Sequence, residues 1–376
     1  MGSAALAPTG QNTTFTGDKQ LRSRPLGPLM EALTDLGAKC LNRKNNGKAP
    51  VKVTGRLAGG KTTIACSTSQ YLSSLLLCVP LAPQDSEINV TLLNEPDYVQ
   101  MTLDWLDKQG IEYESQPPGC LAQPSRGCKF KIKGGQGYKS FDVAIPADFS
   151  SATFFFCAGA LLADKPITIK GLDFSDSQPD KAVVDYLKAM GADIQVEHNL
   201  VRVKRSTLKG IEIDMNKTPD ALPAMAVTAA FAEGTTKLVN VAQARSKETD
   251  RIKCMAEELR KIDVDVEELE DGLIIQGGPI GAPLCAFHGR GDHRIVMALI
   301  LAGMMVTKPY GQCTIIETHE AMSVTFPKYV ELMHGLGRTI EPAGTAYAIY
   351  RLIQKFKKPT KQTLKNTTCP RLELNS

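Results

Sequence analysis

The segment AVVDYLKAMGADIQV (182–196) contains the pattern from which the fold can be predicted. Its apolar residues recur at helical spacing as far as Met190, and Gly191 then supplies the left-handed conformation that often ends a helix. A short β-rich run follows the glycine. The segment therefore predicts an amphipathic helix, a glycine turn and a strand.

The same order of features occurs at four other places in the chain. These segments span 28–40, 101–114, 251–269 and 328–341. The turn residues of these four segments are Gly37, Gly110, Asp263 and Gly337. Together with Gly191, they follow one another along the chain at intervals of 72 to 81 residues. Regular spacing of this kind indicates a duplicated unit.

Each period also contains a second apolar helix rich in alanine and other small residues, as in SQYLSSLLLCVPLA (69–82) and SSATFFFCAGALLA (150–163). One unit is therefore predicted to run strand, helix, strand, helix, strands. Five copies are visible, whereas a symmetric protein of two domains with three units each requires six. The expectation is that the first unit is largely missing from this chain.

The length of 376 residues suits two domains. The first is predicted at 1–145 and is N-terminally incomplete, and the second is predicted at 146–345. The segment 346–376 lacks the repeat, carries a net charge of +6, and is predicted to be a basic tail with the composition of disordered segments. Because the whole chain has a net charge of +4, the body without the tail is near neutral, which does not favour nucleic-acid binding.

The composition is that of a soluble globular protein, with 43% hydrophobic and 22% charged residues. No apolar run approaches the roughly 18 residues needed to cross a membrane, so a cytoplasmic protein is expected. The ten cysteines are scattered singly without a CxxC pair, which predicts buried thiols and neither a metal site nor a disulfide framework.

Residues 55–62, GRLAGGKT, match the phosphate-binding P-loop of nucleotide-hydrolysing proteins. A P-loop requires a helix that starts at its Gly-Lys-Thr, whereas the residues that follow here are β-branched and favour a strand. A glycine-rich hairpin between two strands explains Gly59 and Gly60 equally well. Nucleotide binding is therefore not favoured.

Two polar sites stand at the starts of predicted helices. Thr68, Ser69 and Gln70 precede an apolar run, and the free amides and hydroxyls of a helix N-terminus suit an anion such as phosphate, although a plain N-cap is the commoner use. Asp220, in TPDALPAMAVTAAFA (218–232), is the single charge at the start of an apolar helix. Its isolation in a segment predicted to be buried favours a functional role.

From about residue 14 to residue 341 the chain resembles the 5-enolpyruvylshikimate-3-phosphate synthase family. Seven segments in family order carry the resemblance: GDKQLRSRPLGPLMEAL (17–33), STSQYLSSLLLCVPLA (67–82), DFSSATFFFCAGALLA (148–163), DMNKTPDALPAMAVTAAFAEGTT (214–236), RSKETDRIKCMAEELR (245–260), GRGDHRIVMALILAG (289–303) and VTFPKYVELMHGLG (324–337). Seven motifs in order are a far more specific signal than any one of them.

The resemblance implies an α/β fold, a two-domain inside-out α/β barrel built of repeated βαβαββ units. It also implies transfer of the enolpyruvyl group of phosphoenolpyruvate to the 5-hydroxyl of shikimate 3-phosphate, with release of phosphate, in aromatic amino acid biosynthesis. The family's reaction needs no metal and no cofactor. A monomer is expected, with these two small molecules as substrates and with no nucleic-acid or membrane partner.

The family's motifs also imply a set of site residues. The expected catalytic residues are Asp220, which accepts the proton of the 5-hydroxyl, and the proton-handling pair Lys247 and Glu248. Phosphoenolpyruvate is expected to be bound by Arg24, Arg251 and Arg294. Shikimate 3-phosphate is expected to be bound by Thr68, Ser69, Gln70, Tyr98, Asp220, Gln243 and Lys247.

Some positions depart from the family pattern. The family's S-K-P-Y is EPDY (95–98) here, which puts carboxylates where a phosphate would come, Gln243 replaces an Asn, and Val324 replaces a Lys. The Lys and Arg of the family's first unit have no counterpart. An alternative is therefore a truncated, weakly active or inactive member that only binds substrate. A UDP-N-acetylglucosamine enolpyruvyl transferase is less favoured, because the loop around Cys120 and Cys128 lacks that family's flanking pattern.

Overall fold

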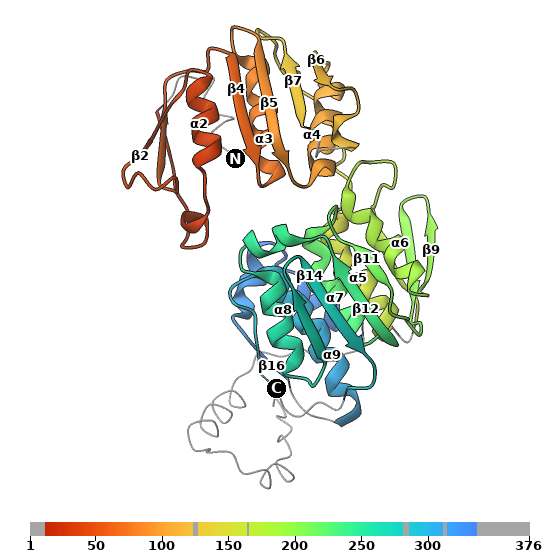
Figure 1. Ribbon diagram of the computed structural model, residues 1–376. Helices are drawn as coiled ribbons and strands as arrows, with labels where there is room; N and C mark the ends of the chain where they lie inside the picture. Colours follow the sequence, from red (N-terminus) through yellow and green to blue (C-terminus); the bar gives the residue numbers. More distant parts are fainter. Residues whose placement is uncertain (1–11, 123–126, 164, 281–285, 311–313, 337–376) are drawn as a thin grey trace, which may run out of the picture. The chain divides into compact units, whose positions relative to one another are not determined.

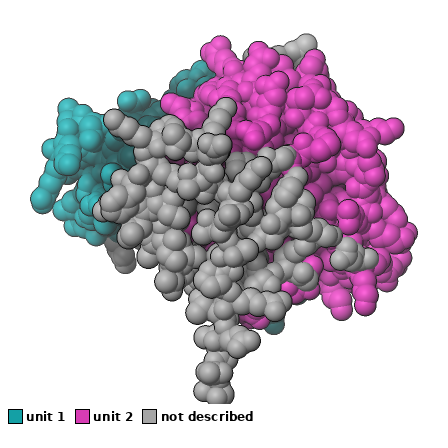
Figure 2. Space-filling view, turned by 90° about the horizontal axis from the view of Figure 1, so that it is seen from below, with its two compact units in different colours: residues 1–146, 173–179 teal, residues 147–172, 180–376 magenta. Residues whose placement is uncertain are grey.

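The computed structural model describes residues 12–122, 127–163, 165–280, 286–310 and 314–336. The chain divides into two compact units, which Figure 2 colours separately. Unit 1 comprises the residues up to Pro146 together with 173–179, and unit 2 comprises 147–172 and the residues from Asp180 onward. The predicted basic tail at 346–376 lies outside the described residues.

Unit 1 contains two sheets with helices packed beside them (Figure 1). The first has the antiparallel order β1-β3-β2, and the second has the order β4-β5-β7-β6, in which only β4 and β5 are parallel. The strands are β1 (Thr13–Phe15), β2 (Lys39–Asn42), β3 (Val51–Thr54), β4 (Gly60–Cys66), β5 (Ser86–Leu93), β6 (Tyr113–Gln116) and β7 (Cys128–Ile132). The helices are α2 (Gly27–Asp35), α3 (Ser69–Cys78) and α4 (Pro96–Gln109).

Unit 2 contains three sheets, with the strand orders β8-β10-β9, β11-β12-β14-β13 and β15-β16. The strands are β8 (Ile167–Lys170), β9 (Asp193–Glu197), β10 (Leu200–Lys204), β11 (Glu212–Asp214), β12 (Gly234–Val239), β13 (Asp265–Leu269), β14 (Gly272–Gly277), β15 (Ala286–His288) and β16 (Ile315–Glu317). The helices are α5 (Phe149–Leu162), α6 (Ala182–Ala189), α7 (Leu222–Ala230), α8 (Arg251–Arg260), α9 (His293–Tyr310) and α10 (Tyr329–His334).

One topology occurs in both units. In β4-β5-β7-β6 and in β11-β12-β14-β13 the chain runs strand, helix, parallel strand, helix, and then two antiparallel strands. A helix therefore joins each parallel pair, as a parallel connection requires. The chain order in these two copies is the one predicted from the spacing of the turns.

The helix ends confirm the predicted turns. Gly37, Gly110 and Gly191 have φ angles of 102°, 71° and 101°, and Asp263 has a φ of 60°. Each follows a helix and precedes a strand of the antiparallel part of its sheet. The left-handed conformation suits glycine, and Asp tolerates it better than most residues. The fifth predicted turn, at Gly337, lies outside the described residues.

The interior of unit 2 is made of helices. Every residue of α7 is buried, as are twelve of the fourteen residues of α5. Helices α5, α7 and α9 contact one another, so α7 is surrounded by apolar side chains. A helix that is apolar on all faces is expected at such a position. The turn that precedes this buried helix is therefore a place where a charged side chain can lie at the edge of the core.

The P-loop-like stretch is a connection between two sheets. Its Gly-Lys-Thr lies at the start of strand β4 and not at the start of a helix, so the segment is not a P-loop. The hairpin interpretation is also wrong, because β3 pairs in the first sheet and β4 in the second. Gly59 is needed for a close approach, since a Cβ there would lie 2.3 Å from the carbonyl oxygen of Gln84.

The described cysteines are free thiols, and all except the half-buried Cys40 are buried. Burial raises the pKa of Cys66 and of Cys157 to about 12, so both stay protonated at neutral pH. Within the described ranges, no three His, Cys, Asp or Glu side chains are grouped so that they could hold a metal ion. None of the helices in this part of the chain is long and apolar enough to cross a membrane.

Candidate active site

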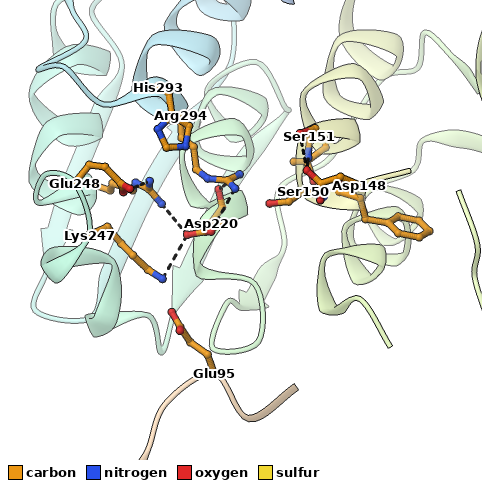
Figure 3. Close-up of polar contacts among 12 residues, drawn as sticks. Glu95, Asp148, Ser150, Ser151, Asp220, Lys247, Glu248, His293 and Arg294 are labelled. Atoms are coloured by element: carbon orange, nitrogen blue, oxygen red, sulfur yellow. Dashed lines mark hydrogen bonds and ion pairs between the residues drawn. The ribbon is translucent and has the colours of Figure 1, made fainter. Parts of the chain in front are cut away.

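A cluster of charged side chains lies where three segments of unit 2 meet (Figure 3). Asp220 belongs to the 3-10 turn η7 (Pro219–Ala221), immediately before the buried helix α7. Lys247 and Glu248 lie between the turn η8 (Ala242–Ser246) and the start of α8. Arg251 is the first residue of α8, and Arg294 is the second residue of α9. The cluster therefore joins residues up to 74 positions apart.

Asp220 is at the centre of this cluster. Its Oδ1 lies 2.8 Å from Nη1 of Arg251 and 3.5 Å from Nζ of Lys247, and its Oδ2 lies 3.3 Å from Nη2 of Arg294. Its side chain is 23% exposed. One carboxylate that stays accessible to small molecules is thus surrounded by three cations.

Arg251 is held by carboxylates on all sides. Its Nε donates to Asp292 at 2.8 Å, Nη1 donates to Asp220 at 2.8 Å, and Nη2 donates to Glu248 at 2.6 Å. The Arg251 side chain is only 1% exposed. A substrate anion can bind this guanidinium only if one of the three carboxylates gives up its place.

Asp292 has two structural functions at the start of α9. Its Oδ1 accepts the backbone N–H of Arg294 at 2.9 Å, which caps the helix, and its Oδ2 accepts from Arg251. The hydroxyl of Thr249 also donates to Oδ2, at 3.2 Å. Asp292 is fully buried, so its charge depends on these bonds and on a second bond from Arg251, whose Nη2 donates to Oδ1 at 3.3 Å. It therefore fixes Arg251 and Arg294 relative to each other.

Mutual charge stabilisation dominates the cluster. Burial alone would raise the pKa of Asp220, but the charges of Arg294, Lys247 and Arg251 outweigh it and hold that pKa well below its ordinary value. Burial alone would lower the pKa of Arg251, but Asp292, Asp220 and Glu248 raise it above its ordinary value. Asp220 and Arg251 are therefore both charged at neutral pH.

His293 provides a prediction about pH. Burial, together with the charge of Arg294, lowers the pKa of His293 below its ordinary value, so the unfolded chain binds this proton more readily than the folded chain. The stability due to neutral His293 is present above about pH 6.5 and is lost as pH falls through the folded pKa. Urea unfolding at pH 7.5 and 5.5 should show a smaller loss of stability in His293→Gln than in the parent chain. If both proteins lose the same stability between these pH values, the lowered pKa of His293 does not account for the pH dependence.

In unit 1, residues 68–70 form the predicted helix N-terminus. Thr68 is the N-cap of α3 in extended conformation, and its hydroxyl accepts the N–H of Gln70 at 3.5 Å. Ser69 is 3% exposed, and Gln70 is exposed. The N–H and hydroxyl of Ser69 are both bonded to Oε2 of Glu95, at 3.3 and 2.9 Å. The expected phosphate position is therefore next to an internal carboxylate.

Arg24 lies near this same helix N-terminus. It ends the turn η2 (Leu21–Ser23), and the carbonyl of the next residue, Pro25, accepts the hydroxyl of Tyr71 on α3. Burial raises the pKa of Tyr71, and the nearby charge of Arg24 opposes the rise. Unit 1 thus brings Arg24 close to the first turn of α3.

The remaining two expected residues are Tyr98 in unit 1 and Gln243 in unit 2. Tyr98 is half-buried in the first turn of α4, three residues after Glu95, whose carbonyl accepts the N–H of Tyr98 at 3.2 Å. Gln243 is in η8, and its Nε2 donates to the carbonyl of Asn216 at 3.0 Å. Gln243 therefore connects the segment of Asp220 to the segment of Lys247.

Comparison with known proteins identifies the family. The model of the family described as EPSP synthase (3-phosphoshikimate 1-carboxyvinyltransferase) matches residues 1–333. The chain belongs to the EPSP synthase family. This confirms the family predicted from the seven motifs, and with it the activity that the family's name states.

Individual EPSP synthases agree with the match. The chain is 50% identical over 328 residues to the 3-phosphoshikimate 1-carboxyvinyltransferase of Acetivibrio thermocellus, and 49% identical over 329 residues to that of Ruminiclostridium cellulolyticum. These alignments cover 87% and 88% of the chain and 74% of each relative. A solved EPSP synthase from Acinetobacter baumannii superposes with a TM-score of 0.71 at 27% identity, over 90% of this chain and 76% of that one. The mixed α/β fold is therefore that of EPSP synthases.

Sequence reasoning missed the importance of two carboxylates. Nothing local in the sequence indicated that Asp292 pairs with Arg251, which lies 41 residues away. Glu95 was noted only as a departure from the family motif. The signal available for both was a carboxylate at the start of a predicted helix, next to residues already assigned to substrates.

Proposed function

We propose that this chain transfers the 1-carboxyvinyl group of phosphoenolpyruvate to the 5-hydroxyl of shikimate 3-phosphate and releases phosphate. The observation that carries the proposal is the position of Asp220, a partly exposed carboxylate contacted by Lys247, Arg251 and Arg294 from separate segments. A carboxylate next to three cations provides both a proton acceptor and anion-binding groups. Both are required for a reaction between two anionic substrates.

The charge balance of the cluster suggests how anions bind. Three cations face three carboxylates, so the cluster as it stands is neutral and its cations are occupied. Lys247 and Arg294 are 20% and 14% exposed, whereas Arg251 is 1% exposed. We expect Lys247 and Arg294 to turn toward the substrates first. Arg251, assigned to phosphoenolpyruvate, then has to exchange Asp220 or Glu248 for the substrate.

This exchange of partners is expected to raise the pKa of Asp220, so that it can accept a proton. With three cations around it, the Asp220 carboxylate is too weak a base, because its pKa lies well below the ordinary value. Substrate anions that draw away Lys247 and Arg294 raise that pKa, because they compensate the charges that depress it. Asp220 then accepts the proton of the 5-hydroxyl as the oxygen attacks C2 of phosphoenolpyruvate. Binding of both anions is thus coupled to activation of the base.

Proton transfer at the methylene carbon is assigned to Lys247 and Glu248. Addition requires a proton on C3 of phosphoenolpyruvate, and elimination of phosphate from the tetrahedral intermediate requires its removal. Glu248 is 20% exposed and accepts from Nη2 of Arg251 at 2.6 Å. Proton delivery at C3 is therefore expected to depend on how Arg251 is paired.

The other assigned residues position the substrates. Arg24 is proposed to contact phosphoenolpyruvate. Shikimate 3-phosphate is proposed to contact Thr68, Ser69, Gln70, Tyr98, Gln243 and Lys247. We further propose that residues 1–145 and 146–345 are the two enolpyruvyl transferase lobes, each built from βαβαββ units as an inside-out barrel. The shared strand order of the two four-stranded sheets supports this arrangement.

A phosphate-release assay with both substrates tests the function. Release that requires phosphoenolpyruvate and shikimate 3-phosphate together is expected, and its absence at high enzyme concentration would contradict the proposal.

The variant Arg294→Ala tests which substrate this arginine binds. Loss of its charge-assisted contact should weaken phosphoenolpyruvate binding about 10- to 150-fold. Shikimate 3-phosphate binding, measured by calorimetry, should change much less. The opposite order would mean that Arg294 serves the other substrate.

A further inference from the structure

The N-terminus of α3 is closed by a carboxylate of the protein itself. One oxygen of Glu95 accepts both the backbone N–H and the hydroxyl of Ser69, 26 positions earlier in the chain. Glu95 is 3% exposed. A helix N-terminus favours a negative group because its free amides and its dipole point outward. The Glu95 carboxylate therefore occupies the position that an incoming anion would take.

The backbone around Glu95 is not in a relaxed conformation. Its φ of 57° and ψ of 51° place it in the left-handed region, and Pro96 follows it as the first residue of α4. Residues other than glycine, asparagine and aspartate rarely adopt this conformation, and such strain is usually retained at functional positions. With the backbone in this conformation, the Glu95 side chain reaches Ser69. A mere N-cap for α3 is already provided by Thr68.

We propose that Glu95 is a specificity-determining residue that occupies the phosphate position at Ser69 until the phosphate group of the substrate displaces it. This inference rests on the proposed function, in which Ser69 binds the phosphate of shikimate 3-phosphate. A phosphate group has three acceptor oxygens and up to two charges, so it can replace the two bonds between Glu95 and Ser69. A neutral hydroxyl in the same place cannot. Glu95 thereby lowers the affinity for the substrate while favouring phosphorylated ligands.

Substitutions of Glu95 test this competition directly in the full chain. Glu95→Gly removes the carboxylate and suits the left-handed backbone, and Glu95→Gln keeps the shape without the charge. Calorimetric titration with shikimate 3-phosphate should show about tenfold tighter binding in Glu95→Gly, because a charge repelling the phosphate at close range has been removed. Glu95→Gln should show a smaller gain. The KM for phosphoenolpyruvate should be unchanged in both.

Glu112→Gln is the matched control. Glu112 is an exposed glutamate of unit 1 that pairs with Lys133, so the variant changes the net charge equally without contacting α3. It should bind shikimate 3-phosphate as the parent chain does. Equal or weaker binding in both Glu95 variants, with or without a lower melting temperature, would overturn the inference and show Glu95 to be a structural cap.

The outcome for Glu95 can be separated from the outcome for the proposed function. If phosphate release proceeds normally but the Glu95 variants bind shikimate 3-phosphate no more tightly, only the competition is wrong. If no variant binds shikimate 3-phosphate at all, the competition and the assignment of Ser69 are both overturned. Because Glu95→Gln preserves the native shape, it carries the test if Glu95→Gly lacks the parent's circular dichroism spectrum.

Discussion

Replacing Asp220 with Asn is expected to lower kcat by about 10²- to 10⁴-fold while shikimate 3-phosphate still binds. The asparagine keeps an oxygen that can accept from Arg251, which now donates to Oδ1 at 2.8 Å, but it cannot take up a proton. Binding geometry should therefore survive, and the chemical step should not. The measurement is phosphate release at saturating substrates, beside calorimetric titration with shikimate 3-phosphate.

The control for this prediction is Asp185→Asn. Asp185 is an exposed aspartate on α6 of the same unit, so the variant removes one carboxylate without touching the cluster. It should keep the parent's kcat. If Asp220→Asn also keeps that rate, Asp220 is not the proton acceptor. If it loses both rate and substrate binding, Asp220 serves chiefly to hold the three cations in place.

The parts of the fold that depend on residues close together in the sequence could be predicted from it. A left-handed turn after an amphipathic helix requires glycine or a tolerant residue such as Asp263, so the turns and the helices before them were visible locally. Strand pairing was not, because it depends on contacts distant in sequence. The glycine-rich stretch before β4 has the composition of a hairpin, yet the two strands that it joins belong to different sheets.

The candidate site likewise has features that could be predicted from the local sequence and features that could not. Asp220 was predicted because a single charge before an apolar helix is visible in the sequence, and α7 is indeed buried along its whole length. The partners of Arg251 were not predictable, because a guanidinium in a charge-dense run is usually solvated. Only the fold brings the buried Asp292 to it. Likewise, no propensity indicated that Glu95 would adopt a left-handed conformation and turn toward Ser69.

Replacing Arg251 with Met is expected to have the largest effect on stability, a loss of about 3–5 kcal/mol in the free energy of unfolding. The reason is that the carboxylates paired with Arg251 would lose their cation. Asp292 is fully buried and receives two of its hydrogen bonds from this guanidinium, at 2.8 and 3.3 Å. A buried charge left without its partner retains the full penalty of leaving water. Urea unfolding followed by circular dichroism measures the loss.

Arg245 provides a matched comparison. Its side chain also bridges two carboxylates, Asp250 at 2.7 Å and Glu268 at 2.9 Å. These carboxylates are 33% and 28% exposed, so water can solvate them when the guanidinium is removed. Arg245→Met should therefore lose only about 1–2 kcal/mol. Adding Asp292→Asn to Arg251→Met should recover part of the larger loss, because it removes the unpaired charge. If Arg251→Met is no less stable than Arg245→Met, the Arg251 network does not stabilise unit 2, and its carboxylates serve the chemistry alone.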